Sequence, residues 1–133
     1  MPVLRSINAL VAGFAIMAFL MLALVTIAAW AVGARAGEPF SPTMLGANIA
    51  VFTVAALAGG YACAALAPGR PRAHAVVLAA MILAMTLTMI AQPPPGAPRW
   101  FPATLAVLGP LSAALGGALY SQRRKRGHSP VPT

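Results

Sequence analysis

The chain has 133 residues, of which 60% are hydrophobic and 8% are charged, and its formal net charge is +8. Soluble domains hold about 25% charged residues, so this chain has too few polar groups to cover a soluble globule. The only acid is Glu38, which excludes chemistry that needs paired carboxylates. The cations lie in gaps between apolar runs and at the C-terminus. This placement indicates membrane topology and argues against nucleic acid as a partner.

The first apolar run covers residues 7–32 and predicts a membrane-spanning helix, because such a helix needs about 20 apolar residues. Residues 34–36 read Ala-Arg-Ala, which resembles a signal-peptide cleavage site. The apolar region of a signal peptide is only about 7–15 residues long, so we expect this run to be retained as a span.

Three further runs, at residues 45–66, 73–91 and 102–120, predict three more spans, and no run contains Asp, Glu, Lys or Arg. We therefore expect an all-α integral membrane protein, with a single four-helix membrane domain over residues 1–122. Residues 123–133 are predicted to form a basic, disordered cytoplasmic tail. Pro102 suits the first turn of its helix, whereas Pro110 lies inside that helix and predicts a kink.

The charges between the runs predict the orientation of the bundle. With four spans, the N-terminus, the turn at residues 67–72 and the tail share one side of the membrane. Because cytoplasmic loops are enriched in Lys and Arg, we expect both termini in the cytoplasm (N-in/C-in). Seven of the nine Lys and Arg residues fall on that side: Arg5, Arg70, Arg72, Arg123, Arg124, Lys125 and Arg126.

Small residues recur at four-residue spacing in several runs, which lets helix backbones approach closely in a membrane. Such stripes serve either packing within one bundle or an interface between copies, and the spacing does not decide between the two. The residues predicted to pack helices or form an interface are Gly59, Gly60, Tyr61, Gly109, Ala113 and Gly117.

Arg70, Arg72 and His74 form a compact basic corner. These side chains either contact an anionic lipid headgroup or phosphate ligand, helped by a helix N-terminus, or only set the topology. His74 begins a helix, where the dipole disfavours a cation, so we expect a neutral imidazole that makes a specific hydrogen bond. The basic tail is expected to lie on the lipid bilayer and contact anionic headgroups.

Catalytic, cofactor and metal sites are not predicted. Small multidrug exporters have a similar length and four helices, but they depend on a membrane-embedded glutamate, and here the only Glu is in a loop. Met81, Met85 and Met89 share one helix face, which fits copper binding or, more commonly, gap filling in a core. The single cysteine, Cys63, cannot form an intramolecular disulfide.

The residues Gly59-Gly60-Tyr61, Ala67-Pro68, Arg70-Pro71 and His74-Ala75 resemble a signature of small, uncharacterised bacterial inner-membrane proteins. That group shares a Gly-Gly-Tyr helix end, a proline-bounded basic turn and a histidine that opens the next helix. The resemblance covers about half of the chain and implies a fold and a location, but no activity.

The sequence thus predicts a multi-pass protein of the bacterial inner membrane without catalytic activity, a structural or accessory subunit. Its partners would be a second copy or another membrane protein. The alternative is a small transporter or channel for an apolar or anionic solute, which would use the Pro110 kink and the basic corner.

Overall fold

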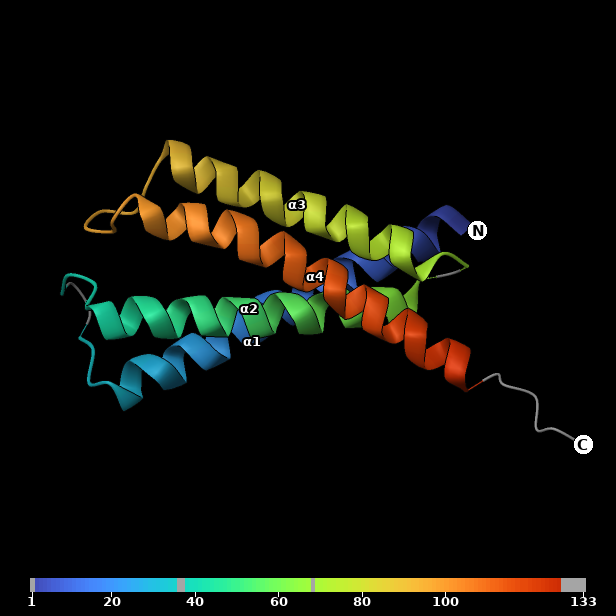
Figure 1. Ribbon diagram of the computed structural model, residues 1–133, viewed down its shortest axis with the longest axis horizontal. Coiled ribbons are helices and arrows are strands. Elements are labelled where there is room, and N and C mark those ends of the chain that lie inside the picture. The colour runs from blue at the N-terminus through green and yellow to red at the C-terminus, as the bar shows by residue number, and fades with distance from the viewer. Residues whose placement is uncertain (1, 36–37, 68, 128–133) are drawn as a thin grey trace, which may run out of the picture.

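The computed structural model describes residues 2–35, 38–67 and 69–127, and within these residues it contains four α-helices and no strand (Figure 1). Each helix is long and apolar enough to cross a membrane. The predicted all-helical architecture with four candidate spans is therefore confirmed. The helices are α1 (Pro2–Ala31), α2 (Pro42–Leu66), α3 (Pro71–Ala91) and α4 (Trp100–Arg126).

Three helices, α1, α2 and α3, begin at prolines, because the fixed φ of proline suits the first helical position and its missing N–H is not needed there. In α2, the Ser41 side chain accepts a hydrogen bond of 3.2 Å from the Met44 amide and caps the helix before Pro42. α2 therefore begins three residues before the apolar run predicted at residues 45–66. In α3, Pro71 follows Gly69, whose positive φ of 77° turns the chain back.

α4 extends beyond the predicted end at residue 120, through Arg123, Arg124, Lys125 and Arg126. Ser121 donates a side-chain hydrogen bond of 2.9 Å to the Gly117 carbonyl oxygen, which ties this turn to the preceding one. The prediction that these four cations belong to a disordered tail is wrong, while residues 128–133 of that tail lie outside the described residues. The helix also continues through Pro110.

α2 is the central helix, since it has extensive contacts with both α1 and α4, which do not contact each other within the described residues, and it also contacts α3. α3 and α4 lie beside each other along much of their length (Figure 1). Large core side chains fill the space between α2, α3 and α4, including Phe52, Leu78, Ile82, Phe101 and Leu105.

Glycines allow the helices to approach closely at three crossings. At the α1–α2 crossing, a methyl group on Gly13 would lie 2.6 Å from the Cys63 Cβ and 2.9 Å from the Gly59 carbonyl oxygen. At the α2–α4 crossing, a methyl group on Gly60 would overlap the Ala113 carbonyl.

At the α3–α4 crossing, a methyl group on Gly117 would overlap the Ala75 side chain, and one on Gly109 would lie 2.9 Å from the Ile82 Cγ2 of α3. The same methyl group on Gly109 would also overlap the Phe52 ring of α2. All three crossings thus leave no room for a side chain at their glycines. The small-residue stripes are used for packing within the chain.

Candidate functional site

The two ends of the bundle differ strongly in charge. The start of α1, the end of α4 and the α2–α3 turn lie at one end, and the α1–α2 and α3–α4 loops lie at the other (Figure 1). The first end therefore carries seven of the nine Lys and Arg residues of the chain. Arg35, Arg99 and the only acid, Glu38, belong to the loops at the second end.

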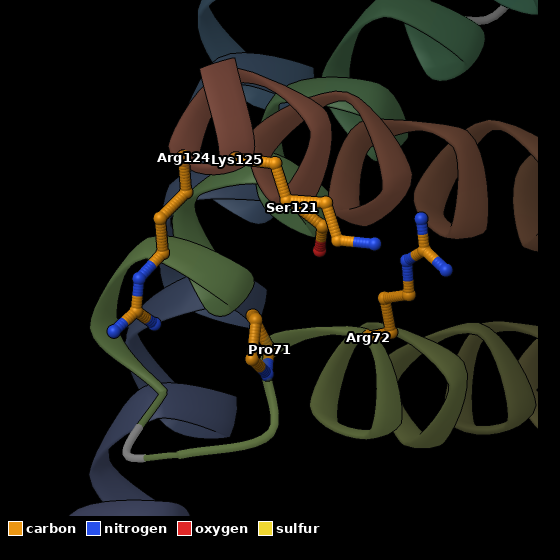
Figure 2. Close-up of a pocket in the computed structure, with 5 residues that line it drawn as sticks. All are labelled: Pro71, Arg72, Ser121, Arg124 and Lys125. Atoms are coloured by element: carbon orange, nitrogen blue, oxygen red, sulfur yellow. The ribbon is translucent and has the colours of Figure 1, made fainter. Parts of the chain in front are cut away.

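A groove at the basic end is lined by the first turn of α3 and the last turns of α4. Its volume is about 480 Å³, and its lining residues are Pro71, Arg72, Ser121, Arg124 and Lys125. Figure 2 shows Arg72 and Lys125 pointing into the space between α3 and α4, and Arg124 extending toward the turn before α3. Three exposed cations from two helices thus surround one hollow; we call it the basic groove.

Helix packing sets the position of the basic groove. Gly117 of α4 lies against Ala75 of α3, so the two helices are in close contact one turn from the groove. Ser121 follows Gly117 by four residues and therefore faces the same way. Its buried hydroxyl forms the floor of the groove and donates to the Gly117 carbonyl.

Of the predicted basic corner, only Arg72 lines the groove. Arg70 is instead the N-cap residue of α3, and its carbonyl oxygen lies 2.9 Å from the His74 Nδ1. Because a carbonyl can only accept, His74 donates from Nδ1 to the backbone of its own helix. The expected specific hydrogen bond of His74 is present, and it serves the start of α3.

Sequence reasoning missed Arg124 and Lys125 as partners of Arg72, because it ended the last helix too early. A signal was present in the sequence. The small-residue stripe Gly109, Ala113, Gly117 continues at the same four-residue spacing to Ser121, which indicates a helix that extends past residue 120. Another turn of helix then brings residues 124 and 125 beside the start of α3.

The residues predicted for packing or an interface all lie in contacts between helices of this chain. Gly59 contacts α1, Gly60 and Ala113 contact each other, and Gly109 and Gly117 lie against α2 and α3 side chains. Tyr61 of α2 makes an edge-to-face contact with Tyr120 of α4, with ring centroids 5.4 Å apart and an angle of 88°.

The guanidinium carbon of Arg123 lies 6.0 Å from the centroid of the Tyr61 ring. At this distance the cation is attracted to the face of the ring. The contact joins the last turn of α4 to the end of α2, which holds the cation-bearing turn against the bundle.

The charged groups of the basic groove are cations, which suit an anion as ligand. The described residues include no group of three His, Cys, Asp or Glu side chains that could hold a metal ion. Cys63 is buried beside Gly13, and Met81 and Met85 face outward from α3. Arg and Lys side chains around a groove bind phosphates and carboxylates through charge-assisted hydrogen bonds.

Comparisons of this chain with protein-family models, with curated proteins and with solved structures found no match. The resemblance to small bacterial inner-membrane proteins therefore stays a prediction.

Proposed function

We propose that the chain is a multi-pass protein of the bacterial inner membrane, with both termini in the cytoplasm and no catalytic activity. The observation that supports this orientation is the charge difference between the two ends of the bundle. Cytoplasmic segments are enriched in Lys and Arg, and the basic end is the one that holds the start of α1 and the end of α4.

A pair of reporter fusions tests the orientation. A reporter that is active only in the cytoplasm, fused after Thr133, is expected to be active, and the same reporter inserted after Gly96 in the α3–α4 loop is expected to be silent. A silent fusion after Thr133 together with an active one after Gly96 would reverse the topology. Two silent fusions with a stable membrane-inserted protein would also contradict it.

We further propose a structural or accessory role, in which the protein packs with a second copy or with another membrane protein. The supporting observation is the exposure of α1. Only Ala9, Gly13 and Met17 of its described side chains are buried, whereas Phe19 and Leu22 are 71% and 70% exposed. One helix of the bundle thus offers a long apolar face that the other three do not cover.

Disulfide cross-linking tests whether α1 is the contact between copies. In a Cys63→Ala background, which keeps the Cβ that packs on Gly13, Leu22→Cys places one thiol on the exposed face of α1. Val107→Cys places one on an exposed position of α4 as the matched control. A dimer formed in membranes by Leu22→Cys and not by Val107→Cys supports self-association.

Purification in mild detergent separates the two partner classes. If no cross-link forms between copies and another membrane protein co-purifies, the result supports the accessory role. A monodisperse monomer that has no partner and no cross-link contradicts the proposal.

A further inference from the structure

We infer that the basic groove binds the phosphate group of an anionic phospholipid, with Arg72, Arg124 and Lys125 as the contacting side chains. The inference rests on the proposed membrane location, but not on the accessory role. It replaces the predicted site at Arg70, Arg72 and His74 with one that joins α3 to α4.

The first support is uncompensated charge. Arg72, Arg124 and Lys125 line one groove of about 480 Å³, and the only acid of the chain belongs to the loop at the other end of the bundle. Like charges brought together repel one another, so an anion that enters the groove relieves this repulsion. None of the residues that line the groove is acidic, so the protein does not itself neutralise these charges there.

The second support is the kind of donor that the groove offers. Ser121 already donates its hydroxyl hydrogen to the Gly117 carbonyl oxygen, so this hydroxyl is not free to donate to a ligand in the groove. The three cations surround the opening (Figure 2). Two guanidinium forks and one ammonium match the oxygens of a phosphate, because Arg binds them through paired donors and Lys acts as a point charge.

The third support is the surface that leads away from the groove, and it favours a lipid over a soluble phosphate. Residues four apart on a helix lie above one another. Val76 is therefore one turn from Arg72, toward the middle of α3, and it is 58% exposed. Ala80 and Leu83 continue this exposed apolar face, along which an acyl chain can lie.

Lipid titration of the full chain tests the inference. The protein is titrated with phosphatidylglycerol in a zwitterionic detergent, and bound lipid is counted by native mass spectrometry. The salt concentration is about 0.15 M, because charges more than about 8 Å apart are then largely screened. The groove variant is Arg72→Gln with Lys125→Gln. The matched control, Arg5→Gln with Arg126→Gln, removes the same charge from the same end outside the groove.

We expect the groove variant to weaken phosphatidylglycerol binding about thirtyfold, from about a fivefold factor for each of the two lost cations, and the control by less than about threefold. The charge-keeping variant Arg72→Lys with Lys125→Arg should retain binding within a few-fold. Equal losses in the groove variant and the control would overturn the inference, because the basic end would then act only through its total charge. Unchanged binding in the groove variant would overturn it as well.

A second arm separates lipid from free phosphate, using inorganic phosphate and phosphatidylcholine as probes. Binding of phosphatidylglycerol that survives millimolar phosphate and exceeds that of phosphatidylcholine supports a lipid ligand. Displacement of the lipid by inorganic phosphate, with equal stabilisation of the protein by phosphate alone, would overturn the lipid assignment. The three cations are exposed, so the variants are expected to fold, and far-UV circular dichroism checks this.

Discussion

Gly60→Ala tests whether the α2–α4 crossing holds the bundle together. A Cβ on Gly60 would overlap the Ala113 carbonyl oxygen, and it would lie only 2.7 Å from the Ala113 carbonyl carbon. Favourable carbon contacts lie at about 3.5–4.0 Å, so the two helices must separate by about 1 Å. The obstacle is the backbone of α4, and no truncation of an α4 side chain relieves it.

The magnitude follows from two opposing terms. Overpacking costs about 1–3 kcal/mol, and a backbone obstacle places the cost at the upper end of that range. Alanine in place of glycine inside a helix contributes about 1 kcal/mol of stability. The matched control is Gly46→Ala, in the same helix, where a new Cβ meets nothing within 4 Å.

Because both variants gain the same helix propensity, the difference between them reports the overlap alone. We expect Gly60→Ala to be less stable than Gly46→Ala by about 2–3 kcal/mol. The assay is reversible unfolding in mixed micelles, followed by circular dichroism during titration with a denaturing detergent. Equal stability of the two variants would refute the reasoning, since the close crossing would then not exist in the folded protein.

Three further substitutions test local features, each measured by the same unfolding assay. Ser41→Ala removes the N-cap of α2 and should cost about 1 kcal/mol, whereas Thr43→Ala, which keeps the cap, should change stability little; equal effects would contradict the cap. Gly69→Ala places a side chain at a φ of 77° and should lower the stability by about 1 kcal/mol. A gain in stability would mean that residue 69 does not have a positive φ in the folded protein. Tyr120→Leu removes the edge-to-face contact with Tyr61 and should cost about 0.5–1.5 kcal/mol; no loss would mean that the rings do not meet.

The helices and their faces could be predicted from the sequence, but the site could be predicted only in part. Apolar runs and prolines indicate spans because the backbone must bond within each segment in lipid. The basic groove depends instead on how α3 and α4 pack. Arg72 and Lys125 belong to different segments, and only the contact of Gly117 with Ala75 places them at one opening.

The end of α4 shows why its boundary was misjudged. Hydrophobicity falls at residue 121, and the predicted end of the helix is the end of the apolar run at residue 120. Cations are favourable in the last turn, where they oppose the negative end of the helix dipole, and Arg123 also has the Tyr61 ring as a partner. Charge at this position therefore supports a helix that continues beyond the apolar run.

The central position of α2 has a consequence for how the protein is made. α2 leaves the ribosome before α3 and α4, so its Gly60 face has no partner from its own chain until the last helix is synthesised. The close backbone approaches of Gly60 to Ala113 and of Gly116 to Leu57 form only at that stage. A chain that stops before α4 would therefore keep this glycine face without a partner from its own sequence.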